Sequence, residues 1–370
     1  MNTKIVVVQS IDALLVYYDD WLKLADNAVE SNAFYEPWML IPAIRHLSPS
    51  RGVLIVLVLE AESERLIGLF PLITVSSYRF LPVKSYECWK HTHSASATPL
   101  IEKNTEHFCF EAFMCWLDES RCRLTWVRFR MFAGNSPLSN QLIELANVQS
   151  RKIDELSVEK RALLKSDLSS QEYFKQYLSK KYVKEHRRLW NRLSEQGELN
   201  YTQFDANKDD VDSWLENFFT LEHAGWKGRA GTAIINKKNE KAFFTDLVHG
   251  AVSHNRASMS RLQLNGVTVA AECSFLSGAG GGMLKIVYDE QYAKFSPGVL
   301  LTFKKTEAIL DEHGYDCFDS YAVPDHPMIN KLWKQDLYVR DFSISTAHVI
   351  SKLALSTITA MVALKHKIQG

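Results

Sequence analysis

Val267-Thr-Val-Ala-Ala-Glu-Cys-Ser-Phe275 alternates between two kinds of side chain along its whole length. The odd-numbered positions are apolar or small, whereas the even-numbered ones include Thr268 and Glu272. A period of two residues predicts a β-strand with one face turned to a core. Asn265-Gly266, the strongest sequence signal for a two-residue hairpin, comes directly before it. The alternating segment 261–264 on the other side of this turn is therefore predicted to be the partner strand.

The chain continues from this hairpin with a glycine-rich turn, a third strand, a helix and a short last strand. Residues 277–282, Ser-Gly-Ala-Gly-Gly-Gly, predict the turn, and residues 283–289 predict the strand. We expect a helix over 297–313 with Gly314 as its stop, and a strand over 315–319. Strands that lead into a helix and back to a strand predict a mixed α/β fold.

Ser296-Pro297-Gly298 stands where this helix begins. Serine is a favoured N-cap, proline is favoured at the first helical position, and glycine lets the backbone come close to a ligand. The unpaired amides and the dipole of a helix N-terminus bind phosphate groups. Proline has no amide hydrogen, so the predicted donors are Gly298, Val299 and Leu300, with the Ser296 hydroxyl beside them.

These motifs together resemble a known family. The strand 267–275, the segment Lys285-Ile-Val-Tyr-Asp289, the Ser-Pro-Gly junction and the segment 321–333 are similar to the GNAT-like acyltransferases described as CelD/BcsL-like, which are related to the FemAB tandem-GNAT fold. The resemblance extends over roughly residues 33–343, and its specific motifs lie in the second half. The phosphate-loop pattern usual in GNAT enzymes, Gln/Arg-x-x-Gly-x-Gly/Ala, is absent, and Ser-Pro-Gly stands in its place.

The resemblance implies an α/β (α+β) fold with two GNAT-like halves, each a mixed, largely antiparallel sheet flanked by helices. It implies an N-terminal half over 1–155 and an acyl-CoA-binding half over 156–346. The helical spacing of the remaining residues predicts an amphipathic C-terminal helix over 347–370. The resemblance also implies the activity, transfer of an acyl group from acyl-CoA to an amine by direct attack. The co-substrate is then acetyl-CoA or a longer acyl-CoA, and the acceptor is a small-molecule amine, an amino sugar or an envelope-polysaccharide precursor.

Direct attack on a thioester needs a base for the amine and benefits from a proton donor for the departing thiolate. Glu272 lies mid-strand among small side chains and is the preferred base, with an ion-paired strand glutamate as the open alternative. Asp319, at the end of the last strand, is the second candidate base. A tyrosine hydroxyl remains protonated at neutral pH, so Tyr292 and Tyr321 are the candidate donors, with packing as the alternative for each.

Two lysines are predicted to contact the CoA phosphates as point charges. Lys285 lies on the strand before the helix, and Lys304 lies on the helix itself, where a solvated side chain is the alternative. Asp289 is expected to shape the loop through an Asx-type turn. No metal is expected, because His91-Thr-His93 lacks an evident third ligand.

Composition limits the classes of partner. Lys+Arg and Asp+Glu both number 43, which gives a formal net charge of +0 and no argument for binding nucleic acid. Hydrophobic residues make up 46% of the chain, enough to build a large core. Neither a signal-peptide pattern nor a membrane-spanning run is found in the sequence, so a cytoplasmic location is expected.

Two further segments have helical spacing. Residues 171–196 predict one long basic helix, either with a solvated charged face or with a role in binding an anionic or nucleotide-linked acceptor. Residues 347–364 are apolar and helical, and the alternatives are docking on the protein and peripheral contact with a membrane surface.

Two other functions stay open at this point. One is FemAB-like transfer from aminoacyl-tRNA, against which the neutral charge argues weakly. The other is a non-catalytic member of the family that binds partners in a polysaccharide-assembly system.

Overall fold

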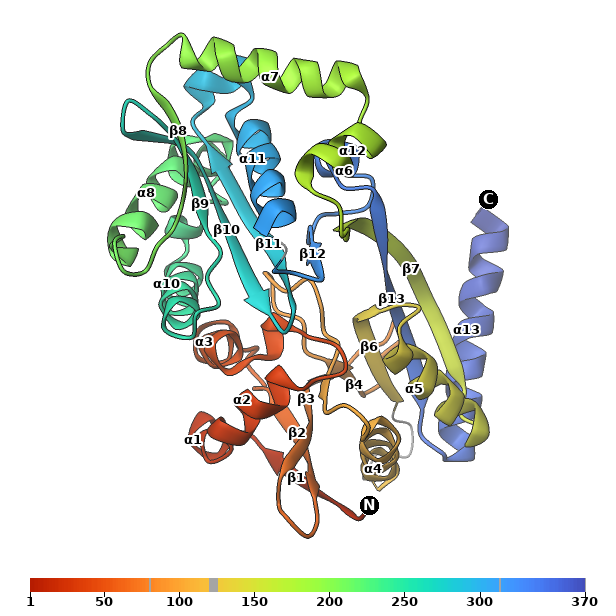
Figure 1. The fold of residues 1–370 in the computed structure, drawn as a ribbon. Helices are drawn as coiled ribbons and strands as arrows, with labels where there is room; N and C mark the ends of the chain where they lie inside the picture. Colours follow the sequence, from red (N-terminus) through yellow and green to blue (C-terminus); the bar gives the residue numbers. More distant parts are fainter. Residues whose placement is uncertain (80, 120–125, 313, 370) are drawn as a thin grey trace. The chain divides into compact units, whose positions relative to one another are not determined.

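The chain forms two compact units (Figure 1). The computed structural model describes the backbone of residues 1–79, 81–119, 126–312 and 314–369, and the side chains of these residues as far as Val362. Unit 1 holds residues 1–159 and 338–370, and unit 2 holds residues 160–337. Strands β7 (Ile153–Leu164) and β13 (Gln335–Ser345) run from one unit into the other. The predicted bounds of the two GNAT-like halves, 1–155 and 156–346, differ from the bounds of these units and remain predictions.

Unit 1 is a sheet flanked by helices. Its strands follow the order β1-β2-β3-β4-β6-β13, with β5 paired to β3, and only the β4–β6 pair is parallel. The other strands are β1 (Thr3–Val8), β2 (Leu54–Glu60), β3 (Leu66–Val75), β4 (Ser85–Cys88), β5 (Leu100–Ile101) and β6 (Trp126–Ala133). The helices are α1 (Ile11–Leu15), α2 (Tyr18–Asp26), η1 (Ala33–Tyr35), α3 (Pro37–Leu47), α4 (Glu106–Asp118), α5 (Pro137–Val148) and α13 (Val349–Gln369).

Unit 2 repeats this architecture. Its strand order is β7-β12-β11-β10-β9-β8, and only the β11–β12 pair is parallel. The strands are β8 (Leu199–Gln203), β9 (Ser260–Leu264), β10 (Val267–Ser277), β11 (Gly280–Tyr288) and β12 (Cys317–Asp319). The helices are α6 (Ser170–Tyr177), α7 (Lys180–Ser194), α8 (Val211–Ala224), α9 (Trp226–Arg229), η2 (Ile234–Asn236), α10 (Lys238–Ser253), η3 (Glu290–Phe295), α11 (Pro297–Glu312) and α12 (Ile329–Leu332). The prediction of a mixed, largely antiparallel sheet in each half is confirmed.

The predicted hairpin is present. Asn265 and Gly266 have φ angles of 51° and 77°, the left-handed values that a type I′ turn requires at both central positions. Val267 pairs with Leu264 directly across the turn. The turn therefore fixes the register in which β9 and β10 meet.

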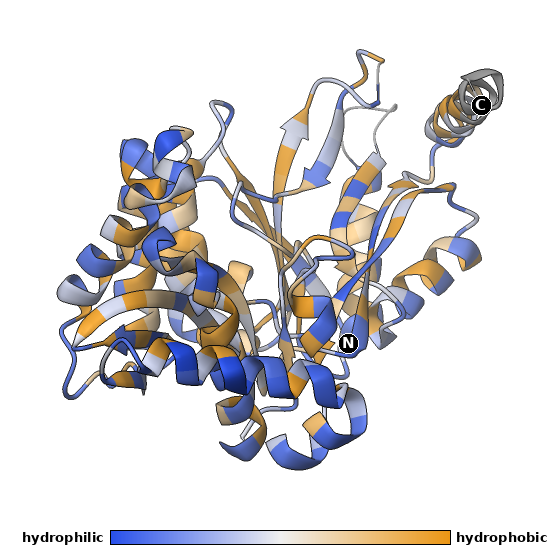
Figure 2. Cartoon of the chain, turned by 90° about the horizontal axis from the view of Figure 1, so that it is seen from above, coloured by the Kyte–Doolittle hydropathy of each residue, from blue (hydrophilic) through white to orange (hydrophobic). Residues whose placement is uncertain are grey.

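The basic segment 171–196 is two helices and not one. α6 ends at Tyr177, and the Ser179 hydroxyl accepts a hydrogen bond of 3.1 Å from the Tyr182 amide at the start of α7. An N-cap serine has extended backbone angles and so breaks a helix where it stands. α7 buries Leu189 and Leu193 in a cluster that includes Phe295, whereas much of its remaining surface is hydrophilic (Figure 2).

The C-terminal helix α13 docks on unit 1. Leu355 and Ile358 are buried against Tyr78 and Trp126. The docking alternative is thereby confirmed for this face of the helix. Within the described part of the chain, no helix is both long enough and apolar enough to cross a membrane.

Candidate functional site

Strand β11 pairs with β10 along one edge over nearly its whole length, but it pairs with β12 along the other edge only at its start. Residues 280–282 pair in parallel with residues 317–319 of β12. Beyond this point residues 283–288 continue to pair with β10, whereas the Ser320 amide turns away to the carbonyl of Ala162. Among the residues that the structure describes, this second edge of β11 has no strand partner after Gly282. Such an edge offers N–H and C=O groups to an extended ligand.

The start of α11 lies against the far end of this open edge. A Cβ atom placed on Gly298 would lie 3.3 Å from Cδ1 of Tyr288 and 3.6 Å from Cδ1 of Ile286. Glycine thus lets the helix N-terminus approach β11 closely. A side chain at this position would therefore meet Tyr288 and Ile286 first.

The free amides at this helix end are fewer than predicted. The Ser296 carbonyl accepts hydrogen bonds from the amides of Val299 and Leu300, at 3.0 and 3.1 Å. The second of these is the first regular bond of the helix, so Leu300 has no amide to offer a ligand. The Gly298 amide has no partner within the described ranges. Gly298, with a shared contribution from Val299, is therefore the remaining donor.

Ser296 does not have the backbone of an ordinary N-cap. Its angles, φ 53° and ψ 55°, are left-handed, whereas an N-cap residue is normally extended. No hydrogen bond of its hydroxyl to another described residue is present. The hydroxyl thus remains available beside the Gly298 amide.

Asp319 and Tyr321 lie together where β11 and β12 diverge. Asp319 is the residue opposite Gly282 in the last pair of the two strands. Its Oδ1 accepts a 3.0 Å hydrogen bond from the Tyr321 amide, and its Oδ2 is 2.5 Å from Nη2 of Arg161. The Tyr321 ring covers Gly282, where a Cβ would lie 2.2 Å from ring atoms. The guanidinium of Arg161 lies 5.4 Å from the centre of the same ring.

Glu272 is buried, and its carboxylate is paired with other side chains of unit 2. The side chain has 0% exposure, and its carboxylate accepts hydrogen bonds from Ser260, at 2.7 Å, and from Ser274. Nζ of Lys305 lies 3.6 Å away. Lys305 of α11 therefore occupies the space beside Glu272 that the small neighbouring side chains leave. The structure matches the alternative of an ion-paired strand glutamate.

The two predicted phosphate lysines point to other partners. Nζ of Lys285 lies 4.0 Å from the carboxylate of Glu222 on α8, and burial, with the nearby charge of Lys227, lowers the pKa of Lys285. Lys304 pairs with Glu307 at 2.6 Å and lies over the ring of Trp190. The structure therefore does not bring either lysine together with the Gly298 amide.

The loop between β11 and α11 has the predicted Asx turn. Oδ1 of Asp289 accepts a 2.9 Å hydrogen bond from the Gln291 amide. Tyr292, in the short helix that follows, packs against the apolar cluster that contains Phe295 and Leu300. This matches the packing alternative for Tyr292, which the structure does not bring to Asp319 and Tyr321.

Two residues of the site were missed from sequence. Arg161 follows a run of mixed charges on β7, and nothing in that run singles it out. Glu222 is buried on α8, where its carboxylate accepts from the Ile234 amide at 2.7 Å and from Lys227 at 3.1 Å. The sequence signal for a buried Glu222 was an acidic residue at a position on the apolar face of that helix. In the described residues no group of three or more His, Cys, Asp or Glu is placed to hold a metal ion.

Comparison with known proteins follows the same division of the chain. Residues 180–326 match the family model of the acetyltransferase (GNAT) domain. No curated protein matches the sequence.

Solved structures resemble the chain along nearly its whole length. The crystal structure of FemX has a TM-score of 0.59 at 9% identity, covering 97% of this chain and 100% of its own. A conserved protein from Bacteroides thetaiotaomicron has a TM-score of 0.55 at 10% identity, with 92% and 99% covered. L-PGS from Bacillus licheniformis has a TM-score of 0.54 at 10% identity, with 95% and 96% covered. The chain thus has a fold similar to that of FemX, and its residues 180–326 match the acetyltransferase (GNAT) domain.

Proposed function

We propose that this protein is a GNAT-type N-acyltransferase that uses acyl-CoA. The observation that carries the proposal is the open edge of β11 beside the start of α11. An acyl-CoA molecule has an extended arm with two amide groups and a pyrophosphate at one end of it. The strand edge suits the amides, and the Gly298 amide with the Ser296 hydroxyl suits the pyrophosphate.

In this proposal the acyl transfer takes place beside Asp319 and Tyr321, where β11 and β12 separate. An amine attacks the thioester carbonyl, a C–N bond forms and the C–S bond breaks. We assign Tyr321 as the donor of the proton that the thiolate takes, and the proton lost by the amine restores the tyrosine. Asp319 already pairs with Arg161 and accepts a hydrogen bond from the Tyr321 amide. Its proposed role is therefore to position Tyr321 through the backbone amide.

The acceptor is proposed to be an amine of a small molecule, an amino sugar or an envelope-polysaccharide precursor. A FemAB-like reaction that takes its acyl group from aminoacyl-tRNA is the second candidate, since the fold likeness to FemX covers 97% of this chain. The third candidate is a non-catalytic protein of the same fold, in which the open edge of β11 binds no acyl-CoA.

Calorimetric titration of the full chain with CoA and acetyl-CoA tests the proposal. We expect saturable binding in the micromolar range, typical of enzyme substrates. Acetyl-CoA should then release free thiol in the presence of one of a panel of amines such as glucosamine. Binding of an aminoacyl-tRNA without any binding of CoA would replace the proposal by the second candidate. Failure of both would favour the non-catalytic alternative.

A further inference from the structure

A cavity of about 850 Å³ lies within unit 2 between α6, α7 and α11. Its apolar lining comes from all three helices and includes Phe174, Leu178, Trp190 and Phe303. A volume of this size lies in the range of small-molecule sites. None of the lining residues is on β11, whereas Leu300, two residues after Gly298 on α11, is one of them.

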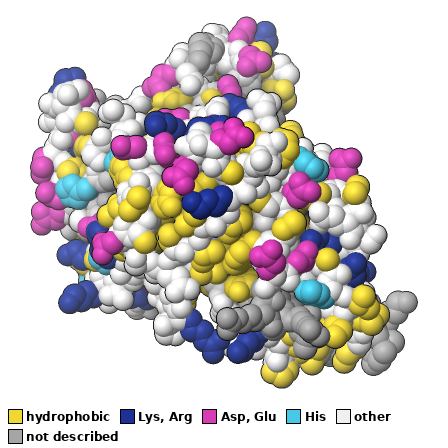
Figure 3. Space-filling view, turned by 90° about the horizontal axis from the view of Figure 1, so that it is seen from below, with side chains coloured by type: hydrophobic (Ala, Val, Ile, Leu, Met, Phe, Trp, Pro, Cys, Tyr) yellow, Lys and Arg dark blue, Asp and Glu magenta, His cyan; other side chains and the backbone are white. Residues whose placement is uncertain are grey.

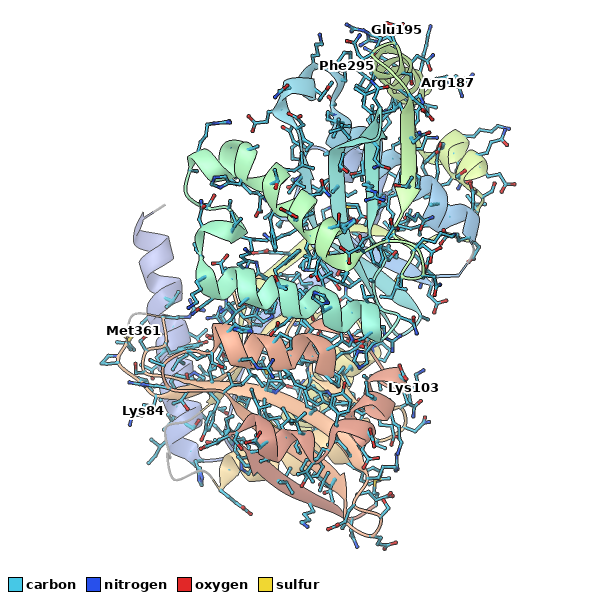
Figure 4. All side chains as sticks on the ribbon, turned by 90° about the vertical axis from the view of Figure 1, so that its left-hand side faces the viewer. Lys84, Lys103, Arg187, Glu195, Phe295 and Met361 are labelled. Carbon is cyan, nitrogen blue, oxygen red and sulfur yellow. The ribbon has the colours of Figure 1, made fainter. Side chains whose placement is uncertain are left out.

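Positive charge surrounds this cavity. Lys304 of α11 is neutralised by Glu307. The other lining cations are Lys175 of α6 and Lys180, Lys184 and Arg187 of α7. Arg187 is labelled in Figure 4. For these four, the described residues supply no ion-pair partner. An apolar cavity with an excess of cations at its wall favours an anion that carries an apolar or planar group.

His186 adds a polar group to the lining. The residue is 5% exposed, and its ring stacks on Phe303 at 4.6 Å between centroids. Nδ1 lies 2.8 Å from the carbonyl of Tyr182, to which it donates as N–H. Burial lowers the pKa of His186, which keeps the ring neutral and leaves Nε2 as an acceptor. Nε2 is buried and finds no partner among the described residues.

We propose that this cavity binds an organic phosphate whose planar or apolar part carries a hydroxyl or N–H group. The phosphate lies near Lys184 and Arg187, the ring or chain lies against Trp190 and Phe303, and the N–H or O–H donates to Nε2 of His186. A nucleoside diphosphate has all three features. A prenyl diphosphate has the phosphate and the apolar part but lacks the donor beyond the phosphate.

Titration calorimetry with ADP, farnesyl diphosphate and inorganic pyrophosphate tests the site on the full chain. We expect ADP to bind at least tenfold more tightly than pyrophosphate and more tightly than farnesyl diphosphate. Equal affinity for ADP and pyrophosphate would overturn the proposal, because it would indicate attraction of any anion. Tighter binding of farnesyl diphosphate than of ADP would overturn the proposed hydrogen bond to Nε2 of His186, because farnesyl diphosphate has no donor for it.

A matched pair of charge reversals locates the site. Lys184 lines the cavity, whereas Lys181 is exposed on the same helix outside it. Lys184→Glu should weaken ADP binding on the order of tenfold and Lys181→Glu should leave it nearly unchanged, since a charge acts mainly on nearby groups. Equal losses in the two variants would contradict the site.

A third variant separates this site from the acyl-CoA site. Ser296→Asp adds a negative charge at the start of α11 and leaves the cavity residues in place. ADP binding that survives Ser296→Asp supports two separate sites even if CoA does not bind at all. ADP binding that is lost in Ser296→Asp and kept in Lys184→Glu would overturn the proposal.

Discussion

The surroundings of single residues in unit 2 differ most from those that the sequence predicts. Glu272 was predicted from a strand of small side chains, and such a pattern does not show which residue of another element fills the space. Here that residue is Lys305, whose Nζ also donates to the carbonyl and hydroxyl of Ser258 at 2.9 and 2.7 Å. The strand pattern predicted the face on which Glu272 lies but not the ion pair that closes it.

Removing the charge of Glu272 should therefore destabilise the fold. Glu272→Gln leaves Lys305 buried without its counter-charge, and breaking a buried pair in this way costs about 3–5 kcal/mol. Denaturant unfolding measures the loss, and adding Lys305→Met to the variant should recover part of it. A variant of unchanged stability whose kcat falls on the order of 100-fold would restore Glu272 as the general base.

Tyr321 is the residue at which we expect an effect on turnover alone. Tyr321→Phe keeps the ring over Gly282 and removes the hydroxyl, so the affinity for CoA and the melting temperature should change little. The kcat should fall by about 10²–10⁴-fold, the usual range for loss of an acid or base. Steady-state kinetics with acetyl-CoA and the best amine gives the comparison. Unchanged kcat would remove Tyr321 from the mechanism.

At the scale of elements, the second half of the sequence was the more informative. The hairpin, its strands β9 and β10 and the helix after Pro297 agree with their predicted positions because each has a local signal, such as Asn-Gly or period two. The turn predicted over 277–282 is too long, because residues 280–282 belong to β11 and pair with β12. β7 was not predicted, since its residues 153–164 mix charges with apolar residues. The division between α6 and α7 was missed for a different reason: Ser179 as an N-cap inside an otherwise helical pattern was not recognised.

The helix α13 offers a test with an internal control. Leu355 is buried against Tyr78 and Trp126, whereas Leu353 is 62% exposed on the same helix. Leu355→Ala should lower the free energy of unfolding by about 2–5 kcal/mol, and Leu353→Ala should stay within about 0.5 kcal/mol of the wild type. Chemical denaturation of both variants measures the two free energies of unfolding. Equal small effects would show that the helix is not docked in solution. Membrane contact through its exposed residues remains a prediction.

At the scale of the whole molecule, the sequence predicted the class of fold. The bounds of the two halves, 1–155 and 156–346, stay predictions, and residues 338–370 group with residues 1–159 in unit 1. The neutral formal charge agrees with the face seen in Figure 3, where acidic and basic side chains are interspersed. The acceptor, the cytoplasmic location and the absence of nucleic acid as a partner remain predictions.

The proposal as a whole depends on phosphate binding at the start of α11, and a matched pair at Ser296 tests this. Asp and Asn both tolerate the left-handed backbone found there, and they differ only in charge. An aspartate would compete with a phosphate for the Gly298 amide and would favour the helix dipole, so stability should be kept or raised. We therefore expect calorimetry to give a CoA affinity at least tenfold lower for Ser296→Asp than for Ser296→Asn. Equal CoA affinities in the two variants would contradict the account.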